Sequence, residues 1–200
     1  MHGGLRARRR ESAILVQQVV SWRLKQKKIG HIVRCHDATN AFYSLDLDKV
    51  EETVRGCFCN KDVPLMLDRV YNSTFEFGEL VGKIYKVGMG CLPGDTAAVV
   101  VFVATYGSAL DEYVMKDMGF GGELCMEAPF GLGREQVKVT GFVDDIADKV
   151  VAASAFQARE SGKQQNEQID MALARCGATQ NVKKQTNVVY AAGSGAYATE

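Results

Sequence analysis

Two adjacent carboxylates, Asp144 and Asp145, follow the residues Gly141–Val143 at a point where two apolar segments meet. Two bare negative charges about 4 Å apart repel by about 4 kcal/mol at an effective dielectric constant of about 20. A divalent cation reverses the sign of that energy, and Mg²⁺ selects hard oxygen ligands that lie close together. The pair therefore indicates one of two things: a divalent-metal site, or a solvated Asp-Asp turn between two strands.

Two further segments hold polar residues at places where a ligand can approach the backbone. Asp37 directly follows a predicted strand over residues 31–36, and its alternative role is to cap a turn or helix. The glycine-punctuated segment Gly90–Ala98 contains Gly94 and Asp95 and opens into an apolar run. Its glycines let the backbone approach a ligand at a helix start, and the alternative is a loop in which Asp95 caps the helix.

The charge of the chain is distributed unevenly. Residues 1–30 hold eight basic residues and one acidic residue, net +7, although the 200-residue chain as a whole is neutral. The rest of the chain therefore carries −7, and this asymmetry indicates a polyanion partner at one end. Exposed arginines without a ligand are the alternative. The candidate nucleic-acid-binding residues are Arg6, Arg8, Arg9 and Arg10.

Composition excludes several classes of protein. Hydrophobic residues make up 46% and charged residues 24%, which is typical of a globular protein and excludes a disordered or fibrous one. The six cysteines contain no CxxC pair, which argues for reduced thiols and against a zinc site. The apolar run 97–106 is about half of what spans a bilayer. We therefore expect an intracellular protein, nuclear or cytoplasmic, neither secreted nor bound to a membrane.

The candidate residues must be positioned by elements whose periodicity can be recognised. Apolar residues at helical spacing predict the first helix, β-branched residues predict the strand over 31–36, and alternation predicts later strands. The predicted elements are, in order, a helix over 11–28, a strand over 31–36, helices over 47–55 and from 62, two short strands over 73–87, a helix over 97–106, a loop over 119–133, a hairpin over 136–152, a polar solvated segment over 161–168 and a helix ending at 176. This alternation predicts an α/β (α+β) fold, a mixed antiparallel sheet with helices packed on one face.

Four segments in this order resemble the motifs of the reverse transcriptases, closest to those of non-LTR retrotransposons and group II introns. The resemblance spans about residues 2–190. The matching residues are, motif by motif, Asp37, Ala41 and Phe42; Gly90, Gly94, Asp95 and Phe102; Phe142, Asp144 and Asp145; and Gly177, Asn181 and Lys184. The family's third motif is an aromatic-x-Asp-Asp string, which Phe142–Asp145 reproduces.

The resemblance implies the palm of a right-hand polymerase and RNA-directed DNA synthesis, in which a dNTP is joined to a primer 3′-hydroxyl. It implies that Asp37 and Asp144 hold two Mg²⁺ ions, with Mn²⁺ as an alternative ion and Asp145 next to them. Phe42 would lie under the sugar, and Lys184 would donate a proton to pyrophosphate. Gly94 and Asp95 would belong to the substrate-binding loop.

The implied partners are an RNA or DNA template with its primer, and dNTPs. The implied organisation is a partial fingers segment over 1–30, a palm over 31–190 and a tail over 191–200, in a fragment of a retrotransposon protein. We expect such a short chain to polymerise poorly or not at all by itself, because the parts that position the substrates are missing. Two alternatives stay open: a decayed palm that binds without polymerising, suggested by Pro93, Thr96 and Tyr43, and a nucleotide cyclase.

Overall fold

A computed structural model describes most of the chain. It covers residues 10–76, 82–91, 96–117, 124–127, 133–143 and 145–192. Its elements are α1 (Arg10–Gln26), β1 (His31–His36), α2 (Ala41–Ser44), α3 (Leu47–Cys57), α4 (Val63–Asn72), β2 (Thr74–Glu76), β3 (Ile84–Lys86), α5 (Thr96–Asp117), β4 (Cys125–Glu127), β5 (Arg134–Gln136), β6 (Val139–Phe142), β7 (Asp145–Val151), α6 (Ala155–Ala174), the 3₁₀ helix η2 (Val182–Lys184) and β8 (Thr186–Tyr190).

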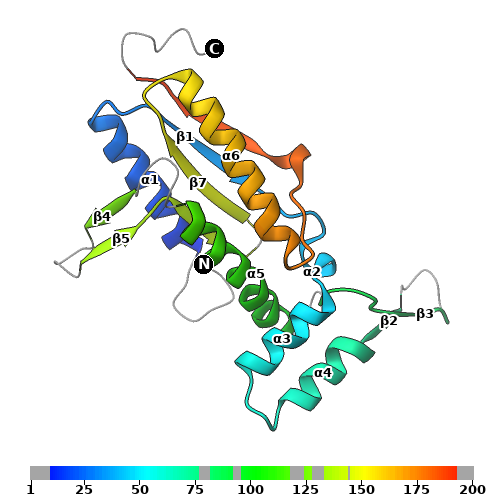
Figure 1. Cartoon of the computed structure of the whole chain (residues 1–200). Helices are drawn as coiled ribbons and strands as arrows, with labels where there is room; N and C mark the ends of the chain where they lie inside the picture. The colour runs from blue at the N-terminus through cyan, green and yellow to red at the C-terminus, as the bar shows by residue number, and fades with distance from the viewer. Residues whose placement is uncertain are drawn as a thin grey trace.

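A four-stranded sheet lies at the centre of the molecule. Its strand order is β6-β7-β1-β8, and every neighbouring pair is antiparallel. β1 lies between β7 and β8 (Figure 1). In the β1–β7 register Arg34 lies opposite Asp148 and His36 opposite Ile146. The predicted strand over 31–36 and the predicted hairpin over 136–152 are therefore confirmed, except that Gln136 belongs to β5.

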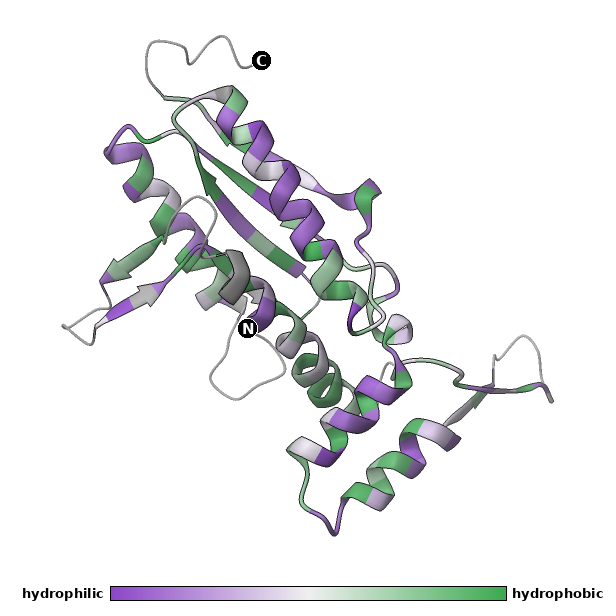
Figure 2. Ribbon diagram, viewed as in Figure 1, coloured by the Kyte–Doolittle hydropathy of each residue, from purple (hydrophilic) through white to green (hydrophobic). Residues whose placement is uncertain are grey.

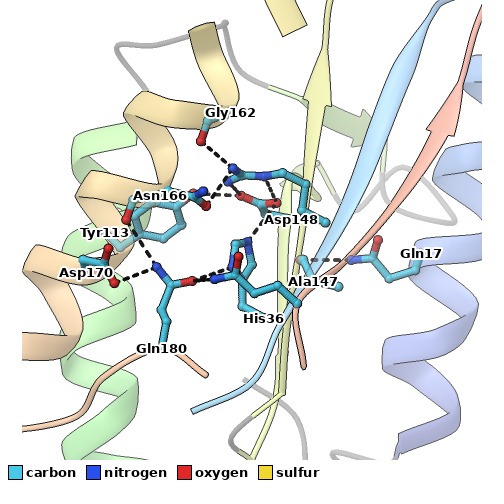
Figure 3. Close-up of polar contacts among 11 residues, drawn as sticks. Gln17, His36, Tyr113, Ala147, Asp148, Gly162, Asn166, Asp170 and Gln180 are labelled. Carbon is cyan, nitrogen blue, oxygen red and sulfur yellow. Dashed lines mark hydrogen bonds and ion pairs between the residues drawn. The ribbon is translucent and has the colours of Figure 1, made fainter. Parts of the chain in front are cut away.

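Helices cover both faces of this sheet (Figures 1 and 3). α5 and α6 pack on one face, as expected, and enclose the main core, whose fully buried members include Phe102, Tyr106 and Ile169. α1 lies on the opposite face, where Val20 and Leu24 pack against Val137. The mixed α/β architecture is thus as the sequence predicts, with one helix added on the second face.

Most boundaries follow local chemistry. α3 begins after Asp46, whose side chain accepts a hydrogen bond from the Asp48 backbone N–H at 2.8 Å. α6 begins after Ser154, which accepts one from the Gln157 N–H at 3.1 Å. The sequence predicts helices over 47–55 and from 62, and both are present. The two short strands predicted over 73–87 are β2 and β3.

Two segments differ from their predictions. The predicted loop over 119–133 contains β4, which pairs with β5 from Cys125 opposite Gln136 onward. The predicted solvated segment over 161–168 belongs to α6, which begins 6 residues earlier, at Ala155. Its polarity has an internal cause, because Gln165 is 1% exposed and other polar groups of this helix contact a buried charge, described below. The predicted tail over 191–200 lies outside the described residues from 193 onward.

α5 is longer than the apolar run that predicts it, and it is the core helix of the fold. By length and composition alone, its segment Ala97–Val114 would suit a membrane span. Half of that segment is buried inside the protein, and Val101, Phe102 and Tyr106 are no more than 1% exposed. α5 packs against both α3 and α6, so its apolar surface is used within the fold.

Candidate active site

Asp37 lies at the end of β1 and is held there by a loop from the other end of the chain. Its carboxylate is mostly buried, with 17% of the side chain exposed. The Oδ2 atom accepts a hydrogen bond from Asn181 Nδ2 at 3.2 Å and lies 3.1 Å from the Lys184 ammonium. Asp37 and Asn181 are 144 residues apart in the sequence, so the first and fourth motif segments meet at one carboxylate.

The β6–β7 turn lies beside the end of β1. His36 and Ile146 form the last pair of the β1–β7 register, and the next residues outward are Asp37 and Asp145. Asp145 is exposed, and Asp144 lies outside the described residues. The register therefore brings the predicted acidic turn to the strand end that carries Asp37.

The residue before the acidic pair has an unusual backbone conformation. Val143 has a φ of 56°, in the left-handed region that β-branched residues rarely occupy. Such a conformation costs of order 1–3 kcal/mol and persists only where the surrounding structure imposes it. Residues of this kind concentrate at functional sites, and here the strained residue directly precedes Asp144.

The donor chemistry of this strand end suits a hard divalent cation. Carboxylate oxygens from two strand ends are the ligands that Mg²⁺ takes. In the part of the chain that is described, no three His, Cys, Asp or Glu side chains come together as a metal site. Asp144, the ligand that would join Asp37, is outside that part. Asp37 and Asp145 supply oxygen atoms of the kind that such an ion takes, and the Oδ2 atom of Asp37 already contacts the Lys184 ammonium.

The second motif segment packs against the first through glycine. Gly90 has a φ of 68°, and a Cβ atom there would overlap the Phe42 carbonyl oxygen. Close approach lets the Cys91 N–H donate to the Phe42 carbonyl at 2.7 Å and the Gly90 N–H donate to the Leu45 carbonyl at 3.0 Å. Only glycine combines this φ with this contact.

Phe42 and the fourth-motif glycine share the same neighbourhood. The Phe42 ring is partly buried and stacks on Phe102, with centroids 4.6 Å apart. Gly177 has a φ of 82°, and a Cβ atom there would lie 2.7 Å from both the Asp46 amide nitrogen and the Ser44 carbonyl oxygen. The turn that carries Phe42 therefore contacts both glycine segments.

Several predicted site residues are not described. Gly94 and Asp95, which the sequence assigns to the substrate-binding loop, lie outside the described residues, and so do Arg6, Arg8 and Arg9. Arg10 is the first residue of α1. The structure thus brings together Asp37, Lys184 and the strand end at Asp145, with Phe42 joined to the second motif.

A buried ion pair, which sequence analysis missed, lies between the sheet and α6 (Figure 3). Arg34 Nε donates to Asp148 Oδ1 at 2.9 Å, and Arg34 Nη2 donates to Asp148 Oδ2 at 2.5 Å. The third guanidinium nitrogen donates to the Gly162 carbonyl at 2.6 Å and to Asn166 Oδ1 at 3.0 Å. The Tyr113 hydroxyl donates to the same carboxylate at 3.0 Å.

The environment of Asp148 controls its ionisation. Burial alone would raise the pKa of this fully buried carboxyl, but the neighbouring His36 and Arg34 groups favour the charged form. Together they lower the pKa of Asp148 from 3.8 to about 2. His36 Nε2 lies 3.6 Å from Asp148 Oδ1, and its other ring nitrogen contacts Gln180. The carboxylate is thus charged and compensated inside the core.

Lys149 points to the opposite face of the sheet. Its side chain is 1% exposed, and its ammonium donates a hydrogen bond to Gln17 Oε1 of α1. Burial lowers its pKa from 10.5 to about 8, against the opposing charge of Asp148. Figure 2 shows the resulting purple, hydrophilic stretch in the middle of β7. Asp148 and Lys149 therefore each have a polar partner inside the fold.

Comparison with known proteins gives the fold a reference. No protein-family model matches the chain, and no curated protein does. A solved structure of apo telomerase from Candida tropicalis, truncated from its C-terminal domain, superposes with a TM-score of 0.62 at 14% identity and covers 92% of this chain and 36% of that one.

Two further telomerase structures, both in complex with a TWJ fragment of telomeric RNA, are similar. The one from Candida tropicalis has a TM-score of 0.58 at 14% identity and covers 90% of this chain and 29% of that one. The one from Candida albicans has a TM-score of 0.61 at 9% identity and covers 89% of this chain and 30% of that one. The chain spans about a third of the length of these proteins. Telomerase is a reverse transcriptase. The chain therefore has a reverse-transcriptase-like fold.

Proposed function

We propose that this chain is the palm of an RNA-directed DNA polymerase, which joins a dNTP to a primer 3′-hydroxyl on a template strand. One observation carries the proposal. Asp37 and the acidic β6–β7 turn lie at the same end of the sheet, one residue beyond the His36–Ile146 pair, and Lys184 contacts the Asp37 carboxylate there. The reverse-transcriptase-like fold supports it. A retrotransposon protein is the parent that we propose.

In this proposal each site residue has a role. Asp37 and Asp144 would hold two Mg²⁺ ions, with Asp145 beside them, and Mn²⁺ could replace Mg²⁺. When bound, such ions would supply stabilisation of negative charge on the attacking and leaving oxygens. Phe42 excludes a ribose 2′-hydroxyl from the sugar site, and Lys184 protonates the leaving pyrophosphate. Gly94 and Asp95, which lie outside the described residues, would belong to the loop that binds the incoming nucleotide.

The binding of nucleic acid by the N-terminal arginines is part of the same proposal. Arg6, Arg8, Arg9 and Arg10 begin a segment of net charge +7 and would neutralise phosphates without reading sequence. The RNA-bound telomerase structures support RNA as a partner. For binding of this type, the logarithm of the affinity falls linearly as the logarithm of the salt concentration rises. We propose a nuclear or cytoplasmic location.

Primer extension tests the proposal. The full 200-residue chain is given an RNA template annealed to a DNA primer, the four dNTPs and Mg²⁺. We expect slow extension that falls by about a hundredfold or more in Asp144→Ala, the scale on which removal of one charge-stabilising group acts. Asp111→Ala, which removes an equal charge from an exposed position on α5, is the matched control and should extend like the parent chain.

The other outcomes separate the alternatives. Binding of metal and of the primer–template without any extension would support a decayed palm and overturn the polymerase. Pro93 and Thr96, which depart from the family pattern, are the reason to include this outcome. Product formed from NTPs without a primer would indicate a nucleotide cyclase. Extension that is equal in Asp144→Ala would show that another residue or a contaminant is responsible.

A further inference from the structure

The loop between α6 and β8 crosses the end of β1 and is fixed to it by backbone hydrogen bonds. The Thr39 N–H donates to the Thr179 carbonyl at 2.8 Å, and the Asn181 N–H donates to the Asp37 carbonyl at 2.7 Å. Ala38 and Gln180 form an isolated antiparallel bridge between these two bonds. The loop therefore runs beside Asp37 in a defined register, with Gln180 at its centre.

This loop restrains the Asp37 carboxylate at one oxygen only. Asn181 Nδ2 and Lys184 Nζ both contact Oδ2, at 3.2 and 3.1 Å. Within the described parts of the chain, no group donates a hydrogen bond to Oδ1. A carboxylate oxygen has two lone pairs, so Oδ1 keeps its capacity to bind a cation while Oδ2 fixes the orientation of the group.

Gln180 uses its whole side-chain amide to hold the loop (Figure 3). Its Nε2 donates to Asp170 Oδ1 at 2.8 Å and to the Asn166 carbonyl at 3.3 Å, and both partners can only accept. Its Oε1 therefore faces His36 Nδ1, at 2.7 Å, and Gln185 Nε2, at 2.6 Å. The amide orientation is fixed by these partners, and His36 must donate from Nδ1.

These contacts connect the loop to the charged core. His36 directly precedes Asp37 in the chain, and its second ring nitrogen lies 3.6 Å from Asp148. Asp148 is in turn held by Arg34, which also contacts α6. The side chains of His36 and Gln180 are themselves buried, 4% and 9% exposed. A movement of Gln180 would therefore shift both the loop and the residue next to Asp37.

We propose that Gln180 is a positioning residue: it sets the register of the loop so that Asn181 and Lys184 hold Oδ2 of Asp37 and leave Oδ1 to a divalent cation. This inference rests on the proposed function. It assigns Lys184 a part in orienting a metal ligand, beyond proton donation. Outer-shell partners of metal ligands typically change metal affinity by about 10–100-fold when they are removed.

The test is the Mn²⁺ affinity of the full chain, measured by electron paramagnetic resonance of the free ion, together with thermal unfolding. Gln180→Leu removes the four hydrogen bonds of the amide and keeps the volume. Thr105→Val is the matched control, because it removes another buried polar group, a hydroxyl that lies 2.9 Å from Thr53 Oγ1 of α3 and 2.9 Å from the Val101 carbonyl. We expect the dissociation constant for Mn²⁺ to rise about tenfold or more in Gln180→Leu and to stay unchanged in Thr105→Val.

A rescue experiment distinguishes positioning from packing. Gln180→Glu places an acceptor against the Asp170 carboxylate, 2.8 Å away in the parent chain, and should weaken Mn²⁺ binding as Gln180→Leu does. Adding Asp170→Asn supplies an amide that can donate to the carboxylate introduced at position 180. The hydrogen bond is then restored with donor and acceptor exchanged. We expect the double variant to regain most of the lost affinity, which a purely steric role of Gln180 would not produce.

The results separate the two proposals. A parent chain that binds no Mn²⁺ would overturn the proposed function and this inference with it. A parent chain that binds Mn²⁺ with the same affinity as Gln180→Leu, when the variant is folded, would overturn the inference alone. Should Gln180→Leu fail to fold, Asn181→Ala carries the test, since it removes the 3.2 Å contact to Asp37 directly.

Discussion

At the scale of single residues, the feature that distinguishes this chain is a charged pair in the centre of its sheet. Arg34 and Asp148 lie opposite each other on β1 and β7 and form two parallel hydrogen bonds. Bidentate geometry of this kind fixes orientation as well as contributing energy. Tyr113 and Asn166 add further hydrogen bonds, one to each member of the pair.

We expect the two members of this pair to be strongly coupled. Asp148→Ala should lower the free energy of unfolding by about 3–5 kcal/mol, because it leaves the Arg34 charge buried without its partner. The double variant Arg34→Met with Asp148→Leu should recover most of that loss, since apolar residues of similar volume replace a buried pair at little cost. Urea denaturation measures both. If the loss of unfolding free energy in the double variant equals the sum of the losses in the two single variants, the pair is not coupled.

Lys149 gives the stability a dependence on alkaline pH. Its folded-state pKa, about 8, lies below the ordinary 10.5 because of burial. Between these values the unfolded chain binds the proton and the folded chain does not, so raising the pH favours the folded state. Burial of the charged Lys149 ammonium destabilises the folded state to its full extent below about pH 8. This destabilisation is relieved as the pH rises to about 10.5.

Lys149→Met removes this titration. We therefore expect the urea midpoint of the parent chain to rise relative to that of Lys149→Met as the pH increases from about 8 to about 10.5. The comparison with the variant removes the contributions of all other titrating groups, because both proteins contain them. A difference between the two midpoints that does not change with pH would contradict the lowered pKa.

At the scale of elements, sequence periodicity succeeds where one side of an element is apolar. β6 follows from alternation, β7 follows as its hairpin partner, and β1 follows from its β-branched residues. α3 and α4 begin at or next to the predicted starts, 47 and 62. The first half of α6 is missed because its inner face is polar, and its partners, Arg34 above all, come from a strand more than 100 residues earlier. No local pattern signals such a pairing. β4 is missed because three residues among glycines are too short to show alternation.

The turn between α2 and α3 connects the motif segments, and its packing depends on Gly90. Gly90→Ala introduces a side chain at a φ of 68° and against the Phe42 carbonyl, so we expect a loss of more than about 1 kcal/mol in the free energy of unfolding. Gly56→Ala is the matched control. Gly56 lies in α3 with open space where an alanine methyl group would lie, and alanine there should stabilise the helix by about 1 kcal/mol.

Thermal and urea unfolding of these two glycine variants measure the difference. Opposite signs are the expected result, because the two substitutions add the same methyl group and differ only in backbone conformation and space. Equal effects at Gly90 and Gly56 would contradict the close approach of the glycine segment to the Phe42 turn.

At the scale of the whole molecule, the fold brings the first, third and fourth motif segments to one end of the sheet. The order of the motifs in the sequence predicts this convergence through the family resemblance, and the β1–β7 register and the Asp37–Lys184 contact agree with it. The interior chemistry was not predictable in the same way. Arg34 and His36 lie on β1, Asp148 on β7 and Gln180 on the loop between α6 and β8, and arginine, aspartate and glutamine are residue types that mostly occupy the surface.

The placement of α1 on the second face is also a property of the whole fold. The sequence identifies α1 as amphipathic but does not say which surface it covers. Lys149 is opposite Val33 in the β1–β7 register, on the face that α1 contacts, and Asp148 is on the face that α6 contacts. Adjacent residues of a strand point to opposite faces, so one strand supplies a buried charge to each side.

The central claim is that Asp37 and Asp144 bind the same divalent ions at the end of the sheet. A double-mutant cycle in Mn²⁺ affinity tests it most directly, with Asp37→Asn, Asp144→Asn, the double variant and Asp111→Asn as the control for lost charge. We expect each single site variant to bind Mn²⁺ at least about tenfold more weakly and the double variant to lose little more than either, because both carboxylates serve one site. Unchanged binding in both single variants, or losses that simply add, would contradict the claim.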